Sequence, residues 1–197
     1  MSRRNSYTTA DYIPWKEAMS LVRRLYRDGD YRMSLMIGCG CFFGIRAGDL
    51  LALRWEQIHD RNELVIHEGK TGKRRVIAIN KSFQSHIRKC YRAMAVADDR
   101  MLCFRNRYGG QISIQMVNRL LKEIGKRYSL DAKNLSTHSL RKTWARKVYE
   151  NENAEGRGEM ALLKLSELMN HSDPSITRRY IGLRQQELSE VYEGLKF

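Results

Sequence analysis

The sequence has little that would interrupt a helical body or carry it through a membrane. Only 2 of the 197 residues are proline, and no Pro- or Ser-rich stretch separates modules, so we expect one largely helical domain over residues 1–197. The longest apolar stretch, residues 33–43, contains a serine and two glycines and is too short to span a bilayer. The N-terminus lacks the apolar core of a secretory signal. We therefore predict a soluble, intracellular protein without membrane contact.

Cysteines are few, and their spacing excludes the usual zinc and redox motifs. The four cysteines form no C-x-x-C pair and have no histidines at zinc-ligand spacing. We expect them to be buried thiols in a reducing cytosol, and we expect neither a metal nor a cofactor. They are Cys39, Cys41, Cys90 and Cys103.

Acidic residues are also in deficit. Lys and Arg number 36 against 22 Asp and Glu, which gives a formal net charge of +14. Such an excess is expected of a chain whose main partner is a polyanion, with nucleic acid as the leading candidate. A solvated basic face that only keeps the protein soluble is the plain alternative. Charge by itself does not decide between the two.

The pattern of apolar residues predicts helices with one small antiparallel sheet, a mainly α fold of the α+β class. Two β-branched runs, 64–67 and 76–79, flank a Gly-rich turn and predict a hairpin with Lys70 near its tip. Asp11, with Thr8 and Thr9, offers capping chemistry for the first helix. Residues 151–159 are polar and predict an exposed loop. Helices are expected over 14–27, 31–43, 49–53, 83–95, 114–128 and 160–169, from 137 onward, and after Asp173-Pro174.

A basic stripe runs along the predicted helix 114–128. Its cations suit a phosphate backbone, although an ordinary solvent-facing surface would look the same. Further exposed cations are expected in the hairpin and beside the last predicted helix. The residues predicted to contact DNA are Lys73, Arg74, Arg119, Lys122, Lys126, Arg178 and Arg179.

Two spaced signatures near the C-terminal end carry the most specific chemistry. His138-Ser-Leu-Arg141 comes first, and His171 and then Tyr180 follow it. Helical spacing places His138 and Arg141 on one side of a helix. Together with the positive charge, this order suggests a site that holds a DNA phosphate and attacks it with a phenol.

The chemistry of a phosphodiester explains why these residue types are needed. Arginines stay protonated, and each binds two phosphate oxygens at once, so Arg46 and Arg141 could clamp the phosphate. A leaving 5′ oxygen needs a proton, and Lys70 could deliver it as a general acid, with Lys73 as the second choice. A tyrosine nucleophile conserves bond energy in a phosphotyrosyl ester, so no ATP is required.

Each of these residues also has an ordinary structural explanation. Tyr180 is one of ten tyrosines, and most of them must simply pack. His138 alone could be a histidine satisfied at a helix end, and Arg141 alone a surface cation. The order and context of the motifs favour the functional interpretation. We predict structural or exposed positions for the remaining histidines, His59, His67 and His86.

The chain resembles the tyrosine recombinases, also called the phage integrase family, over nearly its whole length. The chain resembles either an isolated catalytic domain of this family or its naturally short members, the recombinases that invert fimbrial promoters. We therefore expect no N-terminal core-binding domain and no arm-binding domain. Four blocks carry the resemblance: the stretch from Gly44 to Trp55 with Arg46, the hairpin stretch Lys70-Thr71-Gly72-Lys73, the H-x-x-R of His138 and Arg141, and His171 with Tyr180.

The resemblance implies a role for each matching residue. Tyr180 would be the nucleophile, Lys70 the general acid, and His138 the group that helps to deprotonate the tyrosine. His171 would hydrogen-bond the phosphate, and Asp49 would support the site. Arg46 and Arg141 would bind the phosphate. The implied reaction is site-specific cleavage and rejoining of DNA through a 3′-phosphotyrosyl intermediate.

The resemblance also implies partners. The family acts on double-stranded DNA as a homotetramer through a Holliday junction, and we expect a monomer when the chain is free. An accessory DNA-bending protein is a further expected partner, and the expected location is the nucleoid in the cytoplasm of a prokaryote or of the host of a phage or mobile element. The segment expected to dock on a neighbouring protomer carries the apolar stripe Leu188, Val191, Tyr192 and Leu195.

Two features depart from the family pattern: Asn170 stands where a glycine is usual, and the 151–159 loop is long for the family. Two other functions remain open on the sequence alone. One is a DNA-binding regulator or accessory factor that keeps the fold without catalysis. The other is a type IB topoisomerase, which shares the phosphotyrosine strategy but relaxes supercoils.

Overall fold

The structure, a computed structural model, describes residues 10–183 and residue 193. It divides the chain into two compact units, residues 1–144 and residues 145–197. The long helix α7 (Thr137–Asn153) begins in the first unit and ends in the second. The mainly α fold with a small antiparallel sheet is confirmed. No helix in the described part of the chain is both long enough and apolar enough to cross a membrane.

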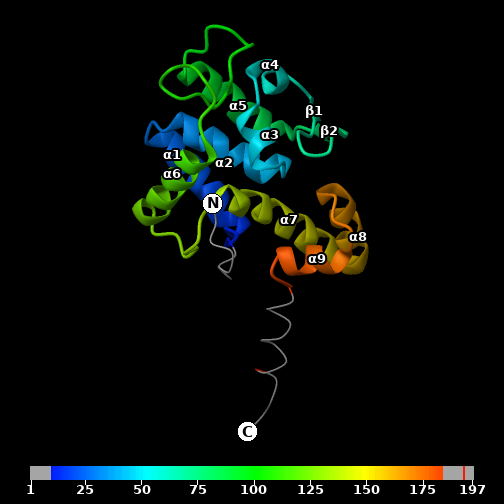
Figure 1. Cartoon of the computed structure of the whole chain (residues 1–197). Helices are drawn as coiled ribbons and strands as arrows, with labels where there is room; N and C mark the ends of the chain where they lie inside the picture. Colours follow the sequence, from blue (N-terminus) through cyan, green and yellow to red (C-terminus); the bar gives the residue numbers. More distant parts are fainter. Residues whose placement is uncertain (1–9, 184–192, 194–197) are drawn as a thin grey trace. The chain divides into compact units, whose positions relative to one another are not determined.

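The first unit is built around one buried helix, α2 (Tyr31–Phe43). Asp30 caps its start by accepting the backbone N–H of Met33 at 3.1 Å, and nearly every residue from Met33 onward is buried. α2 contacts the helices α1 (Trp15–Arg27) and α5 (Lys81–Ala93) (Figure 1). Apolar residues on all sides of α2 thus find a place at the centre, as its composition predicts. The other helices described in residues 10–136 are α3 (Ala47–Leu51), α4 (Trp55–Ile58) and α6 (Ile114–Arg127).

The predicted hairpin forms beside α4 (Figure 1). β1 (Glu63–His67) pairs antiparallel with β2 (Arg74–Ala78), with Glu63 opposite Ala78 and His67 opposite Arg74. Alternate residues of β1 are buried, so one face of the hairpin rests on the core and the other faces solvent. The turn that joins the strands therefore projects as an exposed loop.

In the second unit, the residues described up to 183 form two helices after α7: α8 (Gly158–Met169) and α9 (Pro174–Tyr180). α8 ends at Asn170, which adopts the left-handed conformation with φ of 56°. An asparagine tolerates this conformation better than most residues, so it can replace the usual glycine. Asp173 caps α9 and Pro174 is its first residue, as predicted.

Three local predictions need correction. Pro14 is the N-cap of α1 and makes no side-chain capping bond, while Asp11 instead accepts the backbone N–H groups of Lys133 and Asn134. The helix predicted over 49–53 is α3, which begins and ends two residues earlier, and the short helix α4 that follows it was not predicted. The loop predicted over 151–159 is mostly helical, because α7 runs to Asn153 and α8 begins at Gly158. Thr8, Thr9 and the stripe from Leu188 to Leu195 lie outside the described residues.

Two glycines of the α2 region allow the first part of α7 to pack closely. A Cβ on Gly40 would lie 2.7 Å from Leu140, and one on Gly44 would lie 2.1 Å from the indole of Trp144. Gly44 also has φ of 58°, a conformation that a side chain disfavours. Because Gly44 is two residues before Arg46 and Trp144 is three residues after Arg141, this contact brings the two arginine-bearing segments together.

We expect Gly44→Ala to destabilise the fold by about 2–4 kcal/mol, because it adds both left-handed strain and a clash with Trp144. Denaturant unfolding followed by circular dichroism measures the change. Gly48→Ala is the matched control, since Gly48 is helical and nothing lies within 4 Å of an added Cβ. Equal stabilities of the two variants would contradict the proposed close approach.

Candidate active site

The first unit holds five of the predicted site residues on three elements. Arg46 is the N-cap of α3, and Asp49 lies in the first turn of that helix. Lys70 is exposed in the hairpin turn. α7 supplies His138 and the buried Arg141, which is 6% exposed.

The Arg46 segment is bonded directly to the hairpin turn. Arg46 Nη1 donates to Glu68 Oε2 at 2.5 Å, and the backbone N–H of Gly69 donates to Asp49 Oδ1 at 2.9 Å. These two bonds join the helix that carries Arg46 to the residues on the N-terminal side of Lys70. The turn that presents Lys70 is therefore held against the arginine segment.

Glu68 and Arg75 were not identified from the sequence, although a signal was present. Leu64 and Ile66 are buried on the inner face of β1, and Glu68 is the next residue in the same alternation. Arg75 Nη1 lies 3.6 Å from Glu68 Oε1, and its guanidinium lies over the ring of Trp144 at 5.5 Å. A carboxylate at an inward-facing strand position predicts a buried cation partner.

The surroundings of His138 change the pKa of its imidazole. Partial burial lowers the pKa of His138 below its ordinary value, and the positive charges of Arg141 and Lys142 lower it further. The imidazole is therefore neutral at pH 7, the form that accepts a proton. The effect of Arg141 also shows that the predicted pair, His138 and Arg141, lies close together.

The second unit brings His171 and Tyr180 together. Their ring centroids are 5.7 Å apart in an edge-to-face arrangement. His171 Nδ1 lies 2.9 Å from the hydroxyl of the buried Thr177, and the His171 backbone N–H donates to Ser166 O at 2.9 Å. Tyr180 is the last residue of α9. The turn between α8 and α9 thus orients the imidazole beside the phenol.

The residues predicted to contact DNA are all exposed: Lys73, Arg74, Arg119, Lys122, Lys126, Arg178 and Arg179. Arg119 lies 3.8 Å from Glu123, which partly offsets its charge. A hollow of about 390 Å³ beside α6 is lined by Lys122, Lys126 and also Lys133. Three lysines around one hollow form a local cationic surface.

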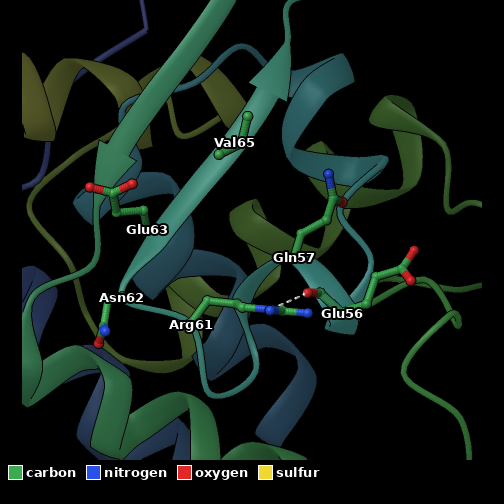
Figure 2. A pocket seen from close by; sticks show the side chains of 6 residues that line it. All are labelled: Glu56, Gln57, Arg61, Asn62, Glu63 and Val65. Atoms are coloured by element: carbon green, nitrogen blue, oxygen red, sulfur yellow. Dashed lines mark hydrogen bonds between the residues drawn. The ribbon is translucent and has the colours of Figure 1, made fainter.

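Another hollow, of about 580 Å³, lies beside the start of β1 and contains none of the predicted catalytic residues (Figure 2). Arg61 crosses it and donates to the backbone oxygen of Glu56 at 2.9 Å. Two carboxylates and one guanidinium give it mixed charge, which does not suit a polyanion. Its lining residues are Glu56, Gln57, Arg61, Asn62, Glu63 and Val65.

The cysteines, His59 and His86 have structural environments, and His67 is exposed. All four cysteines are buried free thiols, as predicted, and burial raises the pKa of Cys41 and Cys90 to about 12. His59 stacks on Tyr91 at 3.6 Å, and His86 bonds the buried Ser34 at 3.0 Å. Among the described residues, no group of three or more His, Cys, Asp or Glu is arranged to hold a metal ion.

Comparison with known proteins identifies the family of the chain. The model of the Phage integrase family matches residues 15–187, which is most of the chain. The chain belongs to the phage integrase family. It is 31% identical over 151 residues to Tyrosine recombinase XerC of Xylella fastidiosa (strain M23), covering 77% of this chain and 48% of the relative.

Further proteins are similar in sequence or in fold. The Probable integrase/recombinase YoeC of Bacillus subtilis (strain 168) is 29% identical over 149 residues, covering 76% of each chain. Crystal structures of XerA recombinase and of a lambda integrase dimer bound to a COC' core site match with TM-scores of 0.71 and 0.64, each at 18% identity. They cover 100% and 93% of this chain, and 68% and 51% of the respective solved chains. The chain spans about half the length of the XerC relatives it matches.

We expect His138 to titrate below 6.5, its ordinary pKa. Arg141→Gln should raise this pKa, because it removes a positive charge that opposes protonation. Ring C–H chemical shifts measured by NMR between pH 4 and 8 follow the titration. In Lys89→Gln the pKa of His86, which Lys89 lowers, should rise while that of His138 stays unchanged. A wild-type His138 that titrates above its ordinary pKa would contradict this account.

Proposed function

We propose that the chain is the catalytic domain of a site-specific DNA recombinase that cleaves and rejoins strands through a 3′-phosphotyrosyl intermediate. The observation that carries the proposal is the contact between His171, in the turn before α9, and Tyr180, the last residue of α9, in a member of this family. A phenol beside an imidazole supplies the chemical groups that attack on a phosphate needs, a nucleophile and a hydrogen-bonding partner next to it.

The proposed reaction balances without an external energy source. Tyr180 Oη attacks the phosphorus, a P–Oη bond forms, and the P–O5′ bond breaks. His138 takes the phenolic proton, and Lys70 gives a proton to the leaving 5′ oxygen. Attack by a 5′ hydroxyl reverses the steps and reseals the strand. One phosphate ester replaces another, so the bond energy is retained.

The other residues would bind the phosphate. Arg46 and Arg141 would stabilise the charge that builds in the transition state, and His171 would donate a hydrogen bond to a phosphate oxygen. Asp49 would support the arginine segment through its bond to Gly69. The neutral state of His138 at pH 7 supports its role as proton acceptor.

Double-stranded DNA is the proposed partner. The net charge of +14 and the exposed lysines beside α6 support this. XerH bound to difH DNA, a relative in fold, matches with a TM-score of 0.67 at 19% identity. We further propose a homotetramer on DNA, a monomer in its absence, an accessory DNA-bending protein, and a nucleoid location in the cytoplasm. We also propose that Lys73, Arg74, Arg178 and Arg179 contact the phosphate backbone of the DNA.

A nicked suicide substrate tests the chemistry. It carries the target of this chain, found by mapping inverted repeats that flank its gene. We expect wild-type protein to form a covalent adduct that survives denaturant, and Tyr180→Phe to form none while still binding DNA. Tyr149→Phe is the matched control, a tyrosine of the same unit that is also only partly exposed.

The other outcomes separate the competing functions. DNA binding without any adduct on a verified target would favour a non-catalytic regulator. Efficient relaxation of plasmids that lack the target, without recombinant products, would favour a topoisomerase. An adduct that persists in Tyr180→Phe would overturn the assignment of the nucleophile.

Salt dependence tests the basic surface of α6. Each phosphate contact releases counterions, so Lys122→Gln and Lys126→Gln should each reduce the slope of log K against log salt by about 1. Fluorescence anisotropy with labelled duplex at several salt concentrations measures the slope. Lys164→Gln serves as the control, because Lys164 already lies 3.6 Å from Glu152. Slopes unchanged by both lysine variants would exclude DNA from this surface.

A further inference from the structure

Glu68 is a carboxylate that the fold buries at the base of the hairpin turn. It is 5% exposed and continues the inward-facing row of β1. Its backbone closes the turn, because its N–H donates to Lys73 O at 3.0 Å and its carbonyl accepts the Gly72 N–H at 2.7 Å. The position of its side chain is thus determined by the strand and the turn together.

The side chain of Glu68 joins three partners from separate segments. Oε2 accepts from Arg46 Nη1 at 2.5 Å and from the hydroxyl of Thr71 at 2.9 Å. Oε1 lies 3.6 Å from Arg75 Nη1. One carboxylate therefore connects the start of α3, the residue after Lys70, and strand β2.

These contacts offset the cost of burying the charge. Burial opposes ionisation of Glu68, but the hydrogen bonds from Arg46 and Thr71 together with the charges of Arg46 and Arg75 outweigh it, so the pKa of Glu68 lies below its ordinary value. Glu68 is therefore ionised at pH 7. Its negative charge also separates two like charges, since Arg46 and Arg75 repel each other.

The two arginines differ in what they need from Glu68. Arg75 is nearly buried, with 12% of its side chain exposed, and a second contact to Phe43 O at 3.5 Å helps to hold it. Its partnership with Glu68 is structural, because a buried guanidinium requires a counter-charge. Arg46 keeps 23% of its side chain exposed, so solvation of its charge does not depend on Glu68 alone. We therefore interpret the bond from Arg46 to Glu68 as one that orients the Arg46 guanidinium.

We propose that Glu68 is a positioning residue that holds the Arg46 guanidinium in its phosphate-binding orientation and ties it to the turn that carries Lys70. The proposal rests on the proposed function, in which the Arg46 guanidinium binds the phosphate. Glu68 touches no reacting atom. It acts through Arg46 and through Thr71, the neighbour of Lys70.

Single-turnover cleavage measures the kinetic effect in the full chain. Glu68→Gln keeps the shape but removes the charge, and we expect cleavage to slow roughly 10- to 100-fold, the range seen when partners that orient a metal-binding ligand are removed. DNA affinity should change less than about 3-fold, since many phosphate contacts contribute to it. Glu63→Gln is the matched control, an exposed carboxylate on the same hairpin. An equal effect of both variants would overturn the proposal.

A double-mutant cycle separates positioning from general stabilisation. If Glu68 acts through Arg46, Glu68→Gln should slow cleavage by less than about 3-fold further in an Arg46→Ala background. A purely structural Glu68 would give the full loss in both backgrounds, which would overturn the proposal. Glu68→Asp keeps the charge but withdraws it by one methylene, so it gives a folded variant if the glutamine variant does not fold. It should recover part of the rate, and a rate no higher than that of Glu68→Ala would count against the role of the charge.

A spectroscopic arm does not depend on catalysis. The side-chain Nε–H resonance of Arg46 in DNA-free protein, assigned by its loss in Arg46→Lys, should shift in Glu68→Gln and Glu68→Asp and stay unchanged in Glu63→Gln. An unchanged resonance in the Glu68 variants would overturn the positioning. A wild-type chain that forms no adduct while this resonance shifts as expected would overturn the proposed function and still support the positioning of Arg46.

Discussion

The close approach of α7 to the C-terminal part of α2 is the constraint on which the first unit depends. Leu140 and Trp144 fit against α2 only because Gly40 and Gly44 have no side chains. This contact determines where Arg141 lies on one side and where the chain turns toward Arg46 on the other. A side chain added at either glycine must move Arg46 relative to Arg141. The packing of the core therefore determines the geometry of the candidate site.

The placement of charged side chains is the second constraint on the candidate site. The first unit places several cations close together. The carboxylate of Glu68 reduces the repulsion between two of them, Arg46 and Arg75. The same carboxylate fastens the hairpin turn, so the exposed Lys70 belongs to a loop with a defined base. His138 is kept neutral by partial burial and by the positive charges of Arg141 and Lys142. In the proposed reaction, this cationic environment would serve both phosphate binding and proton transfer.

Much of the fold was predictable because local rules act strongly here. The bounds of α2 follow from its apolar run between Asp30 and Gly44, and the start of α9 follows from Asp173-Pro174. The errors occurred where local signals were weak or competed with distant contacts. Asp11 has the chemistry of a helix cap, but backbone N–H groups more than 100 residues away in the sequence bind it instead. Polar residues 151–153 extend α7, because exposed helical turns need no apolar pattern.

The sequence by itself determined the family, the main elements and the identity of the candidate residues, because motif order and hydrophobic period are properties of the chain. Only the tertiary structure decided which of those residues touch. It placed His171 beside Tyr180, joined Arg46 to the hairpin, and revealed Glu68 and Arg75 as the ion pair at its base. The physical reason is that the partner of a buried charge is determined by tertiary folding. Glu68 and Arg46 are 22 residues apart in the sequence, so no local pattern predicts their pairing.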